Sequence, residues 1–269
     1  MSASAPLIGI FDSGVGGLSV LRAIRQELPQ EDLLFLADQA HVPYGPRPLL
    51  EVRGFAETIT RYLLSQGAGI VVVACNTASA AALHYLRETF PDVPFVGMEP
   101  AVKPAAESTH TGVVGVLATQ ATFQGALYAS VIERFAQGVT VLQDTCPGLV
   151  GAIEAGHLEG AEARRILENA LQPMLAQGID TVVLGCTHYP FVIPLIQEIV
   201  GPQVRVIDPA PAVARQVGRV LTTRGLPRDG GSGSVCYLTT GDPRRLETLL
   251  PRLVGEAAVV ERITWGEDL

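Results

Sequence analysis

The sequence predicts an α/β protein of two similar parallel-sheet domains, related by pseudo-two-fold symmetry, with an active site between them. Three observations support this prediction. Short apolar runs alternate with longer helical stretches along the 269 residues, a pattern typical of parallel sheets covered by helices. Similar segments recur in the second half of the chain. Two of the recurring runs end in a cysteine, GIVVVACNTAS around Cys75 and DTVVLGCTHYP around Cys186.

The apolar runs are rich in β-branched residues, which predicts strands that are buried on both faces. These strands are expected at residues 7–12, 33–38, 70–75, 94–98, 113–119, 139–144, 181–186, 204–208 and 235–240. Longer stretches between most of them predict helices at residues 17–28, 50–66, 78–89, 123–137, 161–176 and 212–224. The connections are short and contain glycine and proline, as expected for compact βα units.

The internal repeat extends beyond the two cysteine strands. IGIFDSGVGG near residue 8 resembles VGVLATQATF near residue 114, and LLFLAD at 33–38 resembles VTVLQD at 139–144. The separations of 106 to 111 positions are hard to obtain from composition alone. We therefore expect a discontinuous first domain at residues 1–98 plus 210–269, and a second domain at 99–209. GMEPAVKPA (97–105) and IDPAPAVA (207–214) are the expected crossings between them.

Composition excludes several classes of function. Hydrophobic residues make up 48% of the chain and charged residues 17%, which is enough apolar material for buried cores. The net charge of −8, without a cluster of Lys and Arg, argues against nucleic acid as a partner. No apolar run approaches the length of a membrane span, and the first residues lack a signal peptide pattern. We therefore expect a cytoplasmic protein without a membrane partner.

The four cysteines are expected to be free thiols, because disulfides are rare in the cytoplasm. They lie at positions 75, 146, 186 and 236 without a C-x-x-C pair, so no standard zinc framework is present. A Cys at the carboxyl end of a parallel strand lies where open α/β sheets bind their ligands. A following helix N-terminus lowers the pKa of a thiol and also attracts carboxylates.

The residues after each strand-end cysteine can cap the next helix. They are Asn76 and Thr77 after the first, and Thr187 and His188 after the second. The alternative is that both cysteines are small buried hydrophobic residues, which is common for this residue type. The repeated pair with polar followers favours a chemical role for both.

The segment DSGVGG, from Asp12 to Gly17, joins the first strand to a helix. It resembles a dinucleotide fingerprint, and Asp38 lies near the position of a ribose-binding acid. The spacing does not fit, because the third glycine position is occupied by Ser19. We prefer a small cradle in which Ser13 and the glycine amides bind a carboxylate or ammonium group and Asp12 takes part as an ionisable group. The alternative is an ordinary helix cap.

Other polar residues follow the strands. Tyr44 and Gly45 lie in a loop after the second strand and can close a pocket or cover the sheet edge. Thr119 and Thr122 can bind a carboxylate or cap a helix. His188 forms a Cys-x-His spacing, but zinc requires three or four ligands. A role as partner of the neighbouring thiol is favoured over metal binding.

Five motifs occur in the order found in the glutamate racemases of the aspartate/glutamate racemase superfamily, which the chain resembles. They are DSGVGG from residue 12, PYG from 43, ACNT from 74, GMEPA from 97 and GCTHYP from 185. The resemblance implies an enzyme without cofactor or metal that interconverts L- and D-glutamate and supplies D-glutamate for peptidoglycan. Two bases are needed, because one base cannot reach both faces of the α-carbon of a fixed substrate. We also consider a homodimer.

The resemblance also implies roles for individual residues. Cys75 is the expected base for D-glutamate and Cys186 the base for L-glutamate, with Asp12 and His188 as their respective helpers. The expected substrate contacts are Asp12, Ser13, Tyr44, Gly45, Asn76, Thr77, Thr119, Thr122, Thr187 and His188. Glu154 corresponds to an acid near the site in the family. Cys146 and Cys236 match no catalytic motif and are interpreted as structural.

Two other interpretations remain open at this stage. A sibling enzyme on the same scaffold would act on aspartate, a hydantoin or a dicarboxylic acid such as maleate, although the Asn-Thr and Thr-His-Tyr-Pro sequences favour glutamate. A binding or regulatory protein would retain only the fold. The two intact thiols argue against that role, because binding alone does not require them.

Overall fold

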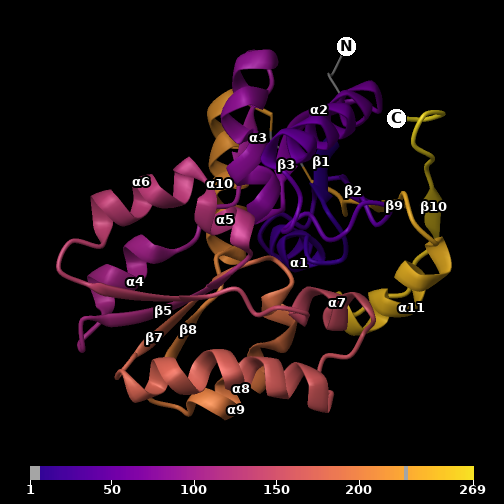
Figure 1. Cartoon of the computed structure of the whole chain (residues 1–269). Helices are drawn as coiled ribbons and strands as arrows, with labels where there is room; N and C mark the ends of the chain where they lie inside the picture. Colours follow the sequence, from indigo (N-terminus) through magenta and orange to yellow (C-terminus); the bar gives the residue numbers. More distant parts are fainter. Residues whose placement is uncertain (1–6, 227–229) are drawn as a thin grey trace.

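The computed structural model describes residues 7–226 and 230–269 and confirms the predicted α/β class (Figure 1). Residues 1–6 of the predicted first domain lie outside the described part of the chain. The first elements are β1 (Leu7–Asp12), α1 (Leu18–Glu27), β2 (Leu33–Ala37), α2 (Leu49–Ser65), β3 (Ala68–Val73), α3 (Asn76–Thr89), β4 (Phe95–Gly97) and α4 (Val102–Ser108). They are followed by β5 (Val113–Ala118), α5 (Gln120–Gln124), α6 (Ala126–Phe135), β6 (Thr140–Asp144), α7 (Leu149–Glu154), α8 (Ala161–Ala176) and β7 (Thr181–Gly185). The last are the 3-10 turn η1 (Tyr189–Val192), α9 (Ile193–Val200), β8 (Arg205–Ile207), α10 (Ala210–Arg224), β9 (Val235–Thr239), α11 (Pro243–Leu253) and β10 (Val260–Arg262).

Two separate sheets organise the molecule, and all strand pairs in both are parallel. The first has the order β10-β9-β2-β1-β3-β4, and the second has the order β6-β5-β7-β8. The order β2-β1-β3-β4 is therefore repeated by β6-β5-β7-β8, which is the symmetry that the sequence repeat predicts. After the second sheet is complete, the chain returns to the first sheet and adds strands β9 and β10 to it. The domain boundaries at residues 98/99 and 209/210 stay a prediction.

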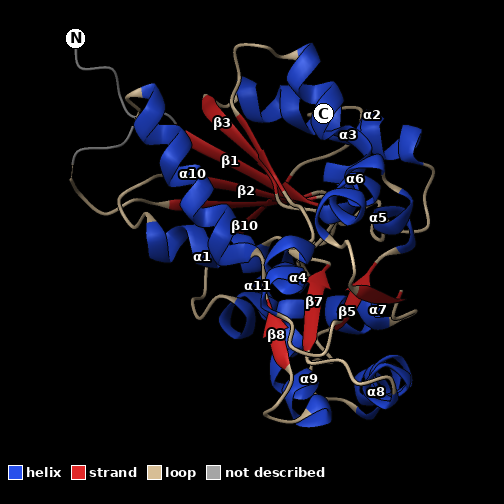
Figure 2. Cartoon of the chain, turned by 90° about the vertical axis from the view of Figure 1, so that its left-hand side faces the viewer, coloured by secondary structure: helices blue, strands red, loops and turns tan. Residues whose placement is uncertain are grey.

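Helices cover both faces of the first sheet, which explains why its strands are uniformly apolar. Figure 2 shows α1 and α10 on one face and α2 and α3 on the other. All five residues of β2 are buried, as are the last five of β1. Strands enclosed in this way have no polar face, so their sequences show unbroken apolar runs instead of alternation.

The structure corrects several predicted boundaries. Strand β3 ends at Val73, and β7 ends at Gly185, so both cysteines lie just beyond their strands. The predicted helix at 123–137 is two helices, α5 and α6, separated at Gly125. Strand β10 and the helices α4, α7, α9 and α11 are present in addition to the predicted elements.

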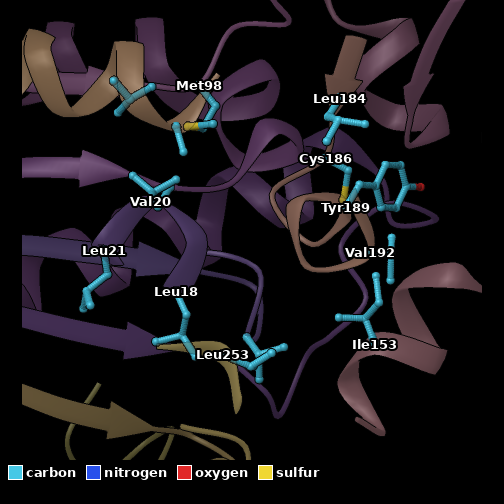
Figure 3. Packing of buried hydrophobic residues seen from close by; sticks show 14 of the residues in the cluster. Leu18, Val20, Leu21, Met98, Ile153, Leu184, Cys186, Tyr189, Val192 and Leu253 are labelled. Carbon is cyan, nitrogen blue, oxygen red and sulfur yellow. The ribbon is translucent and has the colours of Figure 1, made fainter. Parts of the chain in front are cut away.

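One hydrophobic core spans both sheets. Leu18 and Leu21 of α1 belong to the same buried cluster as Ile153 of α7, Val192 of η1 and Leu253 of α11, and Figure 3 shows these side chains. Burying one such side chain contributes roughly 1.5–3 kcal/mol. The two sheets are therefore joined by packing and not only by the two crossings of the chain.

The described residues contain no helix that is both long enough and apolar enough to cross a membrane. All four cysteines are free. In the described ranges, no group of three or more His, Cys, Asp or Glu side chains is arranged to hold a metal ion.

Candidate active site

A cavity of about 410 Å³ lies where the carboxyl ends of strands from the two sheets meet. Its volume is in the range of small-molecule sites. Most of the predicted site residues line it, namely Ser13, Tyr44, Gly45, Cys75, Asn76, Thr77, Thr119, Cys186, Thr187 and His188. Three predicted residues, Asp12, Thr122 and Glu154, do not line this cavity. The hydrogen bonds described below connect each of them to residues that do.

Cys75 is the N-cap residue of α3. The backbone N–H of Ala78 donates to its Sγ at 3.4 Å, and Ser13 Oγ lies 3.9 Å from the same sulfur. Burial raises the pKa of Cys75 well above its ordinary value, and the charge of Asp12 raises it further, whereas the contacts from Ala78 and Ser13 lower it. The helix N-terminus lowers the pKa of Cys75 as expected, through the Ala78 N–H, but burial and the Asp12 charge outweigh it. Cys75 rests as a protonated thiol.

Cys186 has a different environment. The 3-10 turn η1 precedes helix α9, so no regular helix begins directly after this cysteine. Its Sγ instead lies 3.7 Å from Nδ1 of the buried His188. Burial lowers the pKa of His188, but its hydrogen bonds and charge interactions with Cys186 and Glu154 outweigh burial and raise it well above the ordinary value. The arrangement favours an imidazolium beside Cys186, and such a neighbour stabilises a thiolate.

Glu154, the last residue of α7, connects three segments of the chain. Its Oε1 contacts His188 Nε2 at 2.6 Å and accepts from the backbone N–H of Val15 at 2.7 Å. Its Oε2 accepts from Gln39 Nε2 at 3.0 Å. Burial opposes ionisation, but the interactions with His188, Gln39 and Val15 lower the pKa of Glu154 overall. An ionised Glu154 therefore pairs with the imidazolium of His188, which lies in the same half of the molecule. The bonds from Val15 and Gln39 join this pair to the half built on the first sheet.

The glycines of DSGVGG make room for these side chains. A Cβ at Gly14 would overlap the Glu154 carboxylate, and a Cβ at Gly16 would overlap the His188 ring. The backbone N–H of Gly14 donates to Asp12 Oδ2 at 3.0 Å. The amides of residues 14 and 15 thus bind carboxylates of the protein itself. Ser13, the other part of the predicted cradle, lines the cavity, and its contact with a ligand carboxylate or ammonium group stays a prediction.

Asp12 ends β1 and is fully buried behind the cavity. Thr187 Oγ1 donates to its Oδ1 at 3.2 Å, a contact between the two sheets. Burial raises the pKa of Asp12, and the charge of His188 opposes that shift. The charge of Asp12 thus raises the pKa of Cys75. Its carboxylate also holds the side chain of Thr187 through a hydrogen bond.

Hydroxyl and amide groups provide the polar lining. Thr77 and Thr119 share a hydrogen bond of 2.8 Å across the two sheets, and Thr119 and Thr122 share one of 2.9 Å. The carboxamide of Asn76 is buried with neither polar atom hydrogen-bonded in the described structure. None of the described residues lining the cavity is a lysine or arginine. His188 also lines it, but its two ring nitrogens already contact Cys186 and Glu154. The donors left for a bound carboxylate are therefore neutral, with the Asn76 amide available among them.

Cys146 also lines the cavity, although the sequence analysis interpreted it as structural. It has a positive φ of 44°, and its N–H donates to Asp144 Oδ1 at 2.7 Å. Burial raises the pKa of its thiol, so it contributes an uncharged wall. The internal repeat could have predicted this position of Cys146. Strand β6 corresponds to β2, and the loop after each of these strands lines the cavity. Cys236 is exposed and does not line this cavity.

Two equivalent strands deliver two thiols to one cavity, each with its own acid–base neighbour. This fold and this site define an amino-acid racemase. The profile of the family Asp/Glu/Hydantoin racemase matches residues 4–217. The chain belongs to this Asp/Glu/hydantoin racemase family.

Individual relatives agree over nearly the full length. The glutamate racemase of Stutzerimonas stutzeri (strain A1501) is 51% identical over 261 residues, which cover 97% of this chain and 98% of that protein. The crystal structure of glutamate racemase isoform RacE1 from Bacillus anthracis has a TM-score of 0.87 at 31% identity, covering 98% of this chain and 99% of that one. The Escherichia coli glutamate racemase, in complex with L-glutamate and the activator UDP-MurNAc-Ala, has a TM-score of 0.85 at 31% identity, covering 97% and 98%.

Proposed function

We propose that this chain is a glutamate racemase that interconverts L- and D-glutamate by proton transfer between Cys75, Cys186 and the two faces of the α-carbon. The single observation that carries the proposal is the placement of both thiols in one cavity, at the ends of equivalent strands. The choice of glutamate is supported by the relatives, which are named glutamate racemases, and by the L-glutamate bound to the Escherichia coli enzyme.

In the direction from L to D, the Cys186 thiolate removes the α-proton. The C–H bond breaks and an S–H bond forms, while its electron pair remains on a carbanion-like α-carbon. The Cys75 thiol then delivers its proton to the opposite face, so that its S–H bond breaks and a new C–H bond forms. The enzyme is left with a Cys186 thiol and a Cys75 thiolate, and the reverse direction begins from that state. Proton transfer by positioned groups contributes about 10²–10⁴-fold to the rate.

The neighbours of the two thiols suit this division of roles. His188 lies 3.7 Å from Cys186 Sγ, and as an imidazolium it stabilises the thiolate that starts the L-to-D reaction. Burial and the Asp12 charge raise the pKa of Cys75, which favours the thiol form required of the proton donor. We assign helper roles to Asp12 and His188 for this reason, and a role supporting His188 to Glu154.

The substrate carboxylates would bind to neutral donors. Asn76 offers a buried amide without a protein partner in the described structure, and the hydroxyls of Ser13, Thr77, Thr119 and Thr187 line the same cavity. Fixed donors of this kind stabilise charge that develops in the transition state. Closure of the cavity over the bound substrate would also protect the carbanion-like species from water.

The two thiols perform both proton transfers in this mechanism, so the proposal includes no cofactor and no metal. We further propose that the product D-glutamate serves peptidoglycan synthesis in the cytoplasm. The homodimer stays a prediction. A sibling activity on aspartate or a hydantoin is the second candidate, because the matching family includes such racemases.

The decisive assay follows the ellipticity of L-glutamate with purified protein and no added cofactor. We expect the signal to decay to zero, and the signal of D-glutamate to do the same from the opposite sign. Parallel reactions with L-aspartate and a hydantoin test the sibling activity. Constant ellipticity with glutamate and decay with aspartate would replace the proposed substrate. Constant ellipticity with every substrate would contradict an enzymatic role.

A further inference from the structure

Asp38 follows β2 and is a fully buried carboxylate that the proposed mechanism does not use. Its Oδ1 accepts from Thr240 Oγ1 at 2.7 Å and from Trp265 Nε1 at 2.8 Å. Its Oδ2 accepts from Tyr44 O–H at 2.6 Å and contacts His41 Nδ1 at 2.9 Å. A carboxylate offers about four acceptor sites, so these four partners saturate it. Asp38 is therefore not available to bind a substrate or to transfer a proton.

The partners of Asp38 come from distant parts of the chain. Tyr44 and His41 lie in the loop after β2, Thr240 follows β9, and Trp265 lies beyond β10. Aromatic contacts reinforce the same connection. The His41 ring stacks on Phe55 of α2 with a centroid distance of 4.1 Å, and Trp265 meets His41 edge-on at 4.8 Å. The loop 38–47 is thus fixed between helix α2 and the segment 263–269.

This loop forms one wall of the cavity. Tyr44 and Gly45 both line it, and Gly45 approaches Thr119 of the other sheet so closely that a Cβ would contact its side chain at 3.0 Å. Burial and the neighbouring Asp38 raise the pKa of Tyr44 well above its ordinary value, so the phenol stays protonated. Its single proton is donated to Asp38, and its oxygen can only accept a further hydrogen bond. The position of this wall therefore depends on the partners of Asp38.

We propose that Asp38, together with Thr240 and Trp265, forms a positioning set that holds the Tyr44–Gly45 wall at the distance required for substrate binding. The segment 263–269, remote from both thiols in the sequence, thereby contributes to the affinity for glutamate. This inference rests on the proposed function for the identity of the substrate. The positioning itself does not depend on which substrate is bound.

The test uses two variants that each remove one donor to Asp38. Trp265→Phe retains an aromatic ring without the N–H, and Thr240→Val retains the shape of the side chain without the hydroxyl. Tyr85→Phe is the matched control, because Tyr85 O–H donates at 2.6 Å to Glu57, a carboxylate between α2 and α3 that does not line the cavity. Melting temperatures are measured to verify that all three variants fold.

We expect each of the two donor variants to raise the KM for glutamate about tenfold, as the loss of a hydrogen bond to a charged group would do. The kcat should change by less than about twofold, since the thiols and their neighbours are untouched, and the control should retain both parameters. Unchanged KM in both donor variants, or a loss confined to kcat, would overturn the inference.

Hydrogen exchange measured by mass spectrometry gives a second readout that requires no substrate. The amides of residues 39–47 should exchange about tenfold faster in Trp265→Phe, and not in Tyr85→Phe. Unchanged exchange in this loop would refute the positioning set even if the enzyme acts on another amino acid. Wild-type protein that leaves glutamate unchanged would instead refute the proposed function, and the exchange result would still decide the inference.

Discussion

Replacing Glu154 by glutamine tests whether its charge supports His188. The substitution retains the shape of the side chain, and the amide oxygen can still accept from Val15 N–H and His188 Nε2, which both contact Oε1 in the structure. The bond that Oε2 accepts from Gln39 Nε2 is lost, because an amide nitrogen cannot accept it. The fold should therefore be maintained. What disappears is the negative charge 2.6 Å from the imidazole, in a pair whose side chains are only 2% and 13% exposed.

The size of the effect follows from the kind of hydrogen bond that is lost. A bond to a charged group contributes about 1.5–3 kcal/mol and a neutral one about 0.5–1.5 kcal/mol. The difference of roughly 1–1.5 kcal/mol corresponds to about one pH unit. Because the folded pKa of His188 is raised, the imidazolium persists above the ordinary pH range of histidine and is lost as pH rises through the folded pKa. In Glu154→Gln this loss should occur about one unit lower.

The measurement is the pH dependence of kcat/KM for L-glutamate, obtained from circular dichroism across the neutral and alkaline range. The alkaline limb of Glu154→Gln should lie about one pH unit below that of the wild type. Glu57→Gln is the control, since Glu57 pairs with Arg61 and Tyr85 away from the cavity, and it should not alter the profile. An alkaline limb that does not move, or that moves equally in the control, would refute the reasoning.

Four further substitutions test other parts of the site. Cys75→Ser and Cys186→Ser should each lower kcat for racemisation by at least about 10²-fold, measured by circular dichroism; full activity in either would contradict the two-base mechanism. Elimination from an analogue with a leaving group needs one base and should survive in one variant per enantiomer. Gly16→Ala should abolish activity by displacing the histidine ring, whereas Gly54→Ala, which meets no atom within 4 Å, should not; equal activity in both would exclude this steric explanation. Asn76→Ala should raise KM about tenfold without lowering the melting temperature, because the amide has no partner in the described protein; a lower melting temperature with unchanged KM would indicate a structural role.

Most strands were predictable because helices enclose them, as in β1, β2, β3 and β7, whose sequences are unbroken apolar runs. Strand β6 has no buried residue, and its prediction rests on the resemblance of 139–144 to 33–38. The predicted bounds of β1 to β9 agree with the structure to within two residues. The short strand β10 gave no such signal, since Glu261 and Arg262 are exposed. Helix α11 was predictable in principle, because Asp242 caps it and proline follows directly, but it was not included.

The site was predictable where local sequence carries the information. The thiols and the residues that follow them lie in continuous motifs at strand ends, so their meeting in one cavity follows from the repeat. The pKa of Cys75 was not predictable, because burial and a charge on another strand outweigh the local helix end. The contacts of Glu154 with Val15 and Gln39 join the two sheets, and no local pattern indicates such pairs.

The polar lining of the cavity has a consequence for the working conditions of the enzyme. Dissolved ions screen interactions between net charges over about 10 Å at 0.1 M ionic strength, but they affect hydrogen bonds from neutral amides and hydroxyls far less. A dicarboxylate held by Asn76 and the surrounding threonines should therefore keep its affinity when potassium chloride is added. A site lined by arginines would lose affinity under the same change, so the salt dependence of KM distinguishes the two kinds of site.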